Sequence, residues 1–301
     1  MAKIFPPEGP MLPTSAPPNA ANTPRQKAPQ GAVDSHIHML AAASEFPLWE
    51  NRVENPAEGL DMDGFIARYR AQMDTLGIAR TVVVHSILYG GDNAVTLEAI
   101  RRLGPDTTRG VALLPDGAPE AKLDALAAAG VKALRLNYIH GGILTWQGAK
   151  ALAPALAARD MHLQILASAN RHIPEIADDI RRLPCPVVVD HMGWPDLARG
   201  TDDPGFQTLC RLLSEGHAYA KLSAPYRVCA PPFTEATPFA AALAQANPER
   251  CLWGSDWPFI MLADAAMPDA GTLLDRFHDA VSGNADRQRI LVDNPVALYG
   301  F

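Results

Sequence analysis

The stretch that decides the fold is 32-AVDSHIHML-40, a short apolar run that carries two histidines one residue apart, His36 and His38. Side chains alternate between the two faces of a β-strand, so both imidazoles should point to the same side. Two histidines on one face at the end of a strand can bind a metal, stabilise an oxyanion, or serve as ordinary polar residues. The rest of the chain must show which of the three applies.

Seven more runs of this kind follow, and segments with helical periodicity separate them. The eight predicted strands are 32–39, 80–87, 109–114, 131–136, 162–167, 186–191, 218–223 and 250–255. They are apolar nearly throughout, which is typical of parallel strands covered by helices on both faces. Eight strand–helix units predict an α/β protein with the (β/α)8 TIM barrel fold. A doubly wound open sheet would carry a glycine-rich phosphate loop after its first strand, and 35-SHIHMLAAAS-44 has none.

The first part of the chain differs in composition from the rest. Residues 1–31 are rich in proline and small polar residues and show neither helical nor strand periodicity. We therefore predict an extended Pro-rich N-terminal arm at 1–31 and one barrel domain at 32–301. The arm should either pack over the barrel or a neighbouring subunit, or form a disordered tail. It lacks the apolar core of a secretory signal.

The composition excludes several classes of protein. Hydrophobic residues make up 48% of the 301 residues and charged residues 20%, which is ordinary for a soluble globular protein. The formal charge of −7 gives no basic patch, so we expect no nucleic acid partner. No uncharged apolar run is long enough to cross a membrane. Four cysteines far apart, with no CxxC pair, indicate reduced thiols in a cytoplasmic protein. A monomer or a small homo-oligomer is equally compatible with the sequence.

Polar residues gather where the predicted strands end. In a (β/α)8 barrel the reactive groups lie at the carboxyl ends of the strands, so these residues should meet at one mouth. The candidates, in chain order, are His36, His38, Ser86, Tyr89, Arg135, Asn137, Gln164, His191, Trp194, Lys221, Ser223, Arg227 and Asp256. Each has an ordinary alternative: Asp256 could cap a turn, and Asp190 and Asp196 could hold the turn around them. The coincidence of His-x-His, Asp-His and Ser-Asp at strands one, six and eight indicates an active site.

Four of these stretches resemble the amidohydrolase superfamily: 33-VDSHIH-38, 188-VVDHMGWPD-196, 251-CLWGSDWPF-259 and 294-NPVALYGF-301. Within it they are most similar to the 2-pyrone-4,6-dicarboxylate lactonase-like branch, which holds lactone hydrolases and sugar-lactone enzymes. The resemblance extends over residues 32–301. It implies a (β/α)8 barrel and the hydrolysis of a cyclic ester in the breakdown of aromatic or sugar acids. It also implies metal-independent chemistry, as in that branch.

The residues themselves also bear on the metal. His36, His38 and Asp256 could supply the three protein ligands that an open zinc site usually keeps. The binuclear members of the superfamily carry a carboxylated lysine or a glutamate at strand four and a histidine at strand five. This chain has Arg135 and Gln164 at those strands, and a guanidinium adds positive charge where a cation would sit. We therefore expect that no metal or other cofactor is required, with a single zinc as the less favoured case.

The mechanism that follows is hydrolysis of a small anionic lactone. Asp256 should act as the general base for water. Three histidines, His36, His38 and His191, should polarise the carbonyl and stabilise the tetrahedral intermediate. The predicted substrate-binding residues are Arg135, Arg227, Asn137, Ser86, Tyr89 and Trp194.

Guanidinium groups match a carboxylate with two hydrogen bonds, which suggests that the substrate is an acid. The stretch 221-KLSAPYR-227 matches the family's carboxylate-binding arginine, here Arg227. Trp194 stands where the dicarboxylate lactonases carry an arginine, so a mono-acid lactone with an apolar part fits better. The loop 41–59, with Phe46 and Trp49, should lie near the same mouth and act as a lid.

Other functions remain compatible with these residues. A sugar-lactone isomerase would use a substrate hydroxyl in place of water. A zinc-dependent decarboxylase of the same superfamily would need a bound metal. A barrel that binds an acidic metabolite without catalysis would require that Asp256 and the histidines have lost their function.

Overall fold

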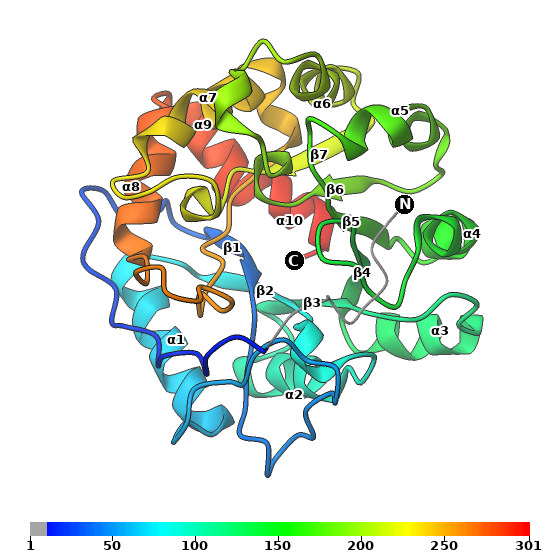
Figure 1. Ribbon diagram of the computed structural model, residues 1–301, viewed down its shortest axis with the longest axis vertical. Coiled ribbons are helices and arrows are strands. Elements are labelled where there is room, and N and C mark those ends of the chain that lie inside the picture. Colours follow the sequence, from blue (N-terminus) through cyan, green and yellow to red (C-terminus); the bar gives the residue numbers. More distant parts are fainter. Residues whose placement is uncertain (1–10) are drawn as a thin grey trace.

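The computed structural model describes residues 11–301, in which eight parallel strands form one sheet in sequential order (Figure 1). The strands are β1 Val33–Ile37, β2 Arg80–Val84, β3 Thr108–Ala112, β4 Val131–Asn137, β5 His162–Leu166, β6 Val187–Val189, β7 Ala218–Lys221 and β8 Cys251–Leu252. The last strand returns to the first, where the Ser35 amide donates to the Trp253 carbonyl at 2.9 Å. The eight predicted strands and the (β/α)8 barrel are thus confirmed.

Helices surround this sheet on its outer side (Figure 1). They are α1 Met62–Leu76, α2 Ala94–Leu103, α3 Glu120–Ala128, α4 Trp146–Ala157, α5 His172–Arg182, α6 Pro204–Ser214, α7 Thr237–Ala246, α8 Ala270–Ala280, α9 Asn284–Gln288 and α10 Asn294–Tyr299. The Asp61 carboxylate caps the start of α1 by accepting from the Gly64 amide. The same helix ends at Gly77, whose φ of 81° is the left-handed conformation that glycine adopts without strain. No helix among residues 11–301 is long and apolar enough to cross a membrane.

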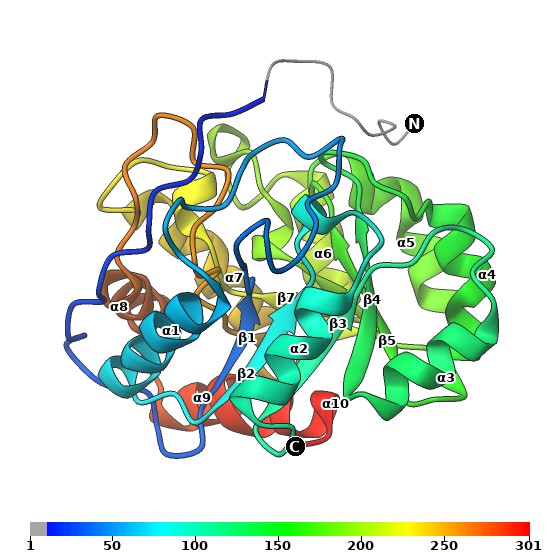
Figure 2. The ribbon, with the colours of Figure 1, turned by 90° about the horizontal axis from the view of Figure 1, so that it is seen from below.

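The interior of the barrel has an apolar lower layer. Its buried residues are Val33, Val82, Val84, Val111, Ala133, Val188, Leu252 and Tyr299. Tyr299 belongs to α10, which lies under the barrel, at the end opposite to the long loops (Figure 2). The ring of His162 lies 5.2 Å from the Tyr299 ring. His162 therefore faces this lower end, away from the strand ends that carry the candidate site.

Residues 11–31 of the predicted arm contain no helix or strand. They run beside α1 and α8 (Figure 2), and the Leu12 amide donates to the Val53 carbonyl at 2.7 Å. Arg25 pairs with Asp275 and Asp279 of α8 at 3.2 and 2.6 Å. Residues 1–10 of the arm lie outside the described residues. The boundary between arm and barrel at residue 31 stays a prediction.

Candidate active site

Asp256 lies just after β8 in a tightly held turn. Its φ is 63°, a conformation that costs a non-glycine residue free energy and that is common at functional sites. The Asp256 amide donates to the His36 carbonyl at 2.9 Å, which ties the turn to β1. The neighbouring Ser255 donates to the Asp34 carboxylate through its amide at 2.8 Å and through its hydroxyl at 2.6 Å. Asp34 thus fixes the turn that carries Asp256, a role that the sequence did not suggest.

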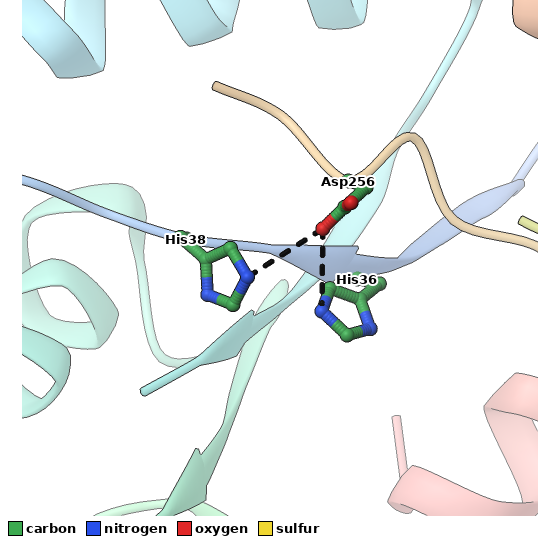
Figure 3. Close-up of side chains that lie close together, drawn as sticks. All are labelled: His36, His38 and Asp256. Atoms are coloured by element: carbon green, nitrogen blue, oxygen red, sulfur yellow. Dashed lines mark ion pairs between the residues drawn. The ribbon is translucent and has the colours of Figure 1, made fainter. Parts of the chain in front are cut away.

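The two carboxylate oxygens of Asp256 have different surroundings. Oδ2 accepts from the Tyr226 hydroxyl at 2.6 Å and from Nε and Nη2 of Arg227 at 3.2 and 3.1 Å. Oδ1 lies 3.6 Å from Nε2 of His36 and 3.5 Å from Nε2 of His38 (Figure 3). Within residues 11–301, Oδ1 accepts no hydrogen bond, although it is fully buried. One oxygen is held in place, and the other has no hydrogen-bond partner among the described residues.

The ionisation of Asp256 follows from these contacts. Burial alone would raise the pKa of this carboxyl, because the charged form loses its hydration. The positive charge of the Arg227 guanidinium, which donates to Oδ2, outweighs burial and holds the pKa well below its usual value. Asp256 is therefore ionised at neutral pH, as a general base must be.

The three histidines form one cluster beside this carboxylate. The His36 ring lies 5.0 Å from the His38 ring and 4.7 Å from the His191 ring. Nδ1 of His38 lies 2.8 Å from the Val84 carbonyl, which can only accept, so Nδ1 carries the proton. Nδ1 of His191 lies 2.9 Å from the Ser223 hydroxyl. Burial lowers the pKa of His191 to about 4, so this ring is neutral at neutral pH.

A buried ionic cluster lies against the histidines. Oδ2 of Asp190 accepts from Nε of Arg135 and from the Gln164 amide, both at 3.1 Å. Lys221, which is fully buried, lies 3.5 Å from Oδ1 of the same carboxylate and 3.2 Å from Nδ1 of His36. Burial lowers the pKa of Lys221 to about 8.

The contacts within this cluster could not be read from the sequence. The interpretation of Asp190 as a simple turn residue is wrong, because its carboxylate connects β4, β5 and β7 at the centre of the site. The sequence places Lys221 at the end of a strand but suggests no role for it. The available signal was one charged residue within each of two apolar strand stretches, 186-PVVVDH-191 and 218-AYAKLS-223. Asp196, by contrast, does hold its turn, since its side chain accepts from the Ala198 amide.

A cavity opens above these groups. Eight of the predicted site residues line it: His38, Ser86, Arg135, Asn137, His191, Trp194, Arg227 and Asp256. The remaining lining residues, Ile87, His140, Leu166, Ile260 and Met261, form a largely apolar wall.

Two of the residues predicted to act in catalysis or substrate binding do not line this cavity. His36 is fully buried, and it lies behind the cavity in contact with Asp256 and Lys221. Tyr89 is also buried, and its hydroxyl pairs with the backbone of Ala41. Tyr89 thus holds the start of the loop 41–59 and makes no contact with the cavity.

Two groups of side chains have the spacing of a metal site. They are His36, His38 and Asp256, and His36, Asp190 and His191, each with ligand atoms within 4.8 Å of one another. Three cationic groups already face the two carboxylates of these clusters. Arg135 and Lys221 lie against Asp190, and Arg227 lies against Asp256. A metal ion bound there would place two further positive charges beside these three cationic groups.

Comparison with known proteins places the chain in a family. The sequence model of the family described as Amidohydrolase matches residues 33–301. The 2-pyrone-4,6-dicarboxylate hydrolase of Comamonas testosteroni is 34% identical over 290 residues, which are 92% of each chain. The 4-sulfomuconolactone hydrolase of Hydrogenophaga intermedia is 31% identical over 90% of this chain and 89% of its own.

Solved structures agree with this assignment. A putative 2-pyrone-4,6-dicarboxylic acid hydrolase from Pseudomonas putida has a TM-score of 0.74 at 26% identity, covering 90% of this chain and 98% of its own. A probable enzyme of the same description from Acinetobacter baumannii has a TM-score of 0.77 at 22% identity, covering 90% and 100%, and shows the shared fold. The resemblance seen in the sequence motifs is thus confirmed, and the chain belongs to the amidohydrolase family.

Proposed function

We propose that this protein is a lactonase that opens the ring of a small anionic lactone with water and without a metal ion. The observation that carries the proposal is the free Oδ1 of Asp256, a buried carboxylate oxygen that faces two imidazoles beside the cavity. The relatives named as hydrolases of 2-pyrone-4,6-dicarboxylate and of 4-sulfomuconolactone support it, because both substrates are cyclic esters.

The first step uses Asp256 as the base. Its Oδ1 takes a proton from water, and the water oxygen attacks the lactone carbonyl, whose electron pair moves onto the carbonyl oxygen. Nδ1 of His38 donates to the Val84 carbonyl, so its Nε2 can accept the other hydrogen of that water. Arg227 and Tyr226 keep the carboxylate oriented through Oδ2.

The second step breaks the ring. The tetrahedral intermediate collapses, the bond from carbon to the ring oxygen breaks, and Asp256 returns its proton to that oxygen. Nε2 of His191 can donate to the oxyanion when the Ser223 hydroxyl donates to its Nδ1.

Arg135 also has the better geometry for the acid group of the substrate. Within residues 11–301 it pairs only through Nε, with Asp190, so both terminal nitrogens can meet a carboxylate. Arg227 uses Nε and Nη2 on Asp256 and Nη1 on the Met261 carbonyl at 3.4 Å. We therefore assign the substrate acid to Arg135 and Asn137, and the support of Asp256 to Arg227.

The apolar wall of the cavity limits the rest of the substrate. Trp194, Leu166 and Ile260 offer no charge to a second acid group. A lactone with one acid group and an apolar or aromatic part is thus the best match. Four free thiols further support the predicted cytoplasmic location, and a monomer or small homo-oligomer remains our expectation.

An isomerase is the second candidate, because a D-galactarolactone isomerase of Agrobacterium fabrum is 26% identical to this chain. It would use a hydroxyl of a sugar acid in place of water. The apolar wall favours the hydrolase, since a sugar lactone would leave several hydroxyls without partners there.

A screen of lactones tests the proposal. Protein dialysed against a strong chelator is assayed on aromatic monocarboxylate lactones, a pyrone dicarboxylate, sugar-acid lactones and neutral lactones. We expect the mono-acid lactones to open and the neutral ones to react at least about tenfold more slowly, since one charge-assisted hydrogen bond is lost. If no lactone opens, the lactonase proposal is wrong. If chelation abolishes turnover and zinc restores it, the metal-independent part is wrong.

A further inference from the structure

We propose that Lys221 is a positioning residue that fixes the tautomer of His36, so that His36 turns an N–H toward the free oxygen of Asp256. Only the kinetic part of this inference rests on the proposed lactonase function. The arrangement of the three side chains carries the rest.

Lys221 has three N–H groups and forms three hydrogen bonds, while a fourth acceptor, Oδ1 of Asp190, lies 3.5 Å away and accepts no hydrogen bond from residues 11–301. Its Nζ lies 2.9 Å from the Ser35 carbonyl, 2.8 Å from Oε1 of Gln164 and 3.2 Å from Nδ1 of His36. A carbonyl and an amide oxygen can only accept, so two N–H groups of the ammonium go to them. The third meets Nδ1 of His36, which must then present its lone pair. A neutral imidazole with an unprotonated Nδ1 carries its proton on Nε2.

Asp190 competes with Lys221 for the same ring atom. Its Oδ1 lies 3.3 Å from Nδ1 of His36 and accepts no hydrogen bond from residues 11–301. A carboxylate there would favour a protonated Nδ1, which is the opposite tautomer. The other oxygen, Oδ2, is already held by Arg135 and Gln164, so Asp190 cannot turn away. Lys221 is the described group that outweighs this preference.

The tautomer matters because of what Nε2 faces. It lies 3.6 Å from Oδ1 of Asp256, and it is buried with no hydrogen-bond partner in the described chain (Figure 3). A proton on Nε2 stabilises the ionised carboxylate, whereas a lone pair there would repel it. Lys221 thus acts on the proposed base through His36, without touching the cavity.

The neighbouring His38 has the opposite assignment. The Val84 carbonyl fixes its proton on Nδ1, so its Nε2 accepts. Two imidazoles on one strand face are therefore held in different tautomers by different partners. His36 donates toward Asp256, and His38 accepts from the water that Asp256 activates. This division of roles explains why β1 carries two histidines side by side.

Nitrogen NMR of isotope-labelled histidine tests the assignment without any substrate. The protonated and unprotonated ring nitrogens resonate far apart, and the His36 signals are those that disappear in His36→Gln. We expect Nε2–H for His36 in the wild-type protein. In Lys221→Met, which keeps the length of the side chain but not its donors, the proton should move to Nδ1. Nδ1–H in the wild-type protein would overturn the proposal even if Lys221→Met failed to fold.

A double variant serves as the matched control. In Lys221→Met/Asp190→Asn the amide nitrogen can replace Oδ1 and donate to Nδ1 of His36, so Nε2–H should return. Circular dichroism establishes that each variant is folded. A folded Lys221→Met variant that keeps Nε2–H on His36 would contradict the proposal.

Kinetics provides the functional readout once a lactone is known. Lys221→Met should lower kcat by about 10²-fold, comparable to the loss of one preorganised donor. KM should change little, because Lys221 does not line the cavity. An unchanged kcat together with a changed tautomer would show that the tautomer has no role in turnover. If no lactone is turned over, the NMR result still stands, so the two proposals fail separately.

Discussion

At the lower end of the barrel the strands fill the interior with valine and alanine, and Tyr299 closes it from below. At the upper end the same strands place arginine, glutamine, lysine and aspartate over the same axis. On β4, Ala133 belongs to the lower layer and Arg135, two residues later, contacts Asp190. On β5, His162 lies against Tyr299 and Gln164 against Asp190. A step of two residues along a strand thus separates the packed end from the reactive end.

The first strand departs from this simple alternation. Val33 lies in the lower layer, whereas His36, three residues later, points into the site. The pairing of β1 with β2 shifts in register between Asp34 and Ile37, which returns the histidines to the interior. Opposite this shift, Gly254 leaves no room for a side chain, because a Cβ there would lie 2.6 Å from Cβ of His36. The site therefore depends on the register shift in β1 and its close contact with Gly254, as well as on the regular strands.

The largest expected effect is at the upper end, for Asp256→Asn. The amide keeps the shape of the carboxylate but cannot take a proton, so kcat should fall by about 10²–10⁴-fold. KM should change much less, since Arg135 holds the acid group of the substrate. Asp196→Asn is the matched control, because Asp196 lies exposed in the neighbouring loop. If Asp256→Asn keeps most of its turnover, Asp256 is only a structural turn residue.

The next effect concerns substrate binding. Arg135→Met should raise KM and lower kcat/KM by about ten- to a hundredfold, the loss of a charge-assisted hydrogen bond. The exposed Arg171→Met is the control. With a neutral lactone, Arg135→Met should leave kcat/KM unchanged. If kcat/KM falls equally for the anionic and the neutral lactone, Arg135 does not bind the acid group.

Arg227→Met should show itself mainly in the pH profile. Arg227 contributes to holding the pKa of Asp256 well below its usual value, so its removal should raise that pKa. A base works only when ionised, and activity is lost as the pH falls through its pKa. The acidic limb of kcat/KM should therefore move to higher pH in the variant. A limb that does not move would show that Arg227 does not support Asp256.

The smallest effect should be at the lower end, for Tyr299→Phe. The Tyr299 hydroxyl is buried and has no hydrogen-bond partner among residues 11–301. Removing it should leave kcat unchanged and leave the free energy of unfolding equal or higher by up to about 1 kcal/mol. Denaturant unfolding measures this change. A loss of activity would contradict the separation of the two ends.

The regular part of the molecule could be predicted from its sequence. Apolar runs separated by amphipathic segments predicted all eight strands, and the strand-end rule predicted that His191 and Asp256 meet. The depth of His36 could not be predicted, because it depends on the register shift in β1. The partners of Lys221 could not be predicted either, since a single lysine in a strand does not reveal which carboxylate compensates its charge.

We propose that Asp256 activates water for lactone opening without a metal. The most direct test of this proposal follows the reaction of an anionic lactone in isotopically labelled water, with chelator-treated wild-type protein and with Asp256→Asn. We predict that the treated wild-type protein keeps its rate and that the new carboxylate carries one labelled oxygen, whereas Asp256→Asn proceeds at nearly the uncatalysed rate. An unlabelled isomer as product would contradict the proposed hydrolysis. Loss of turnover after chelator treatment would contradict the proposed metal independence.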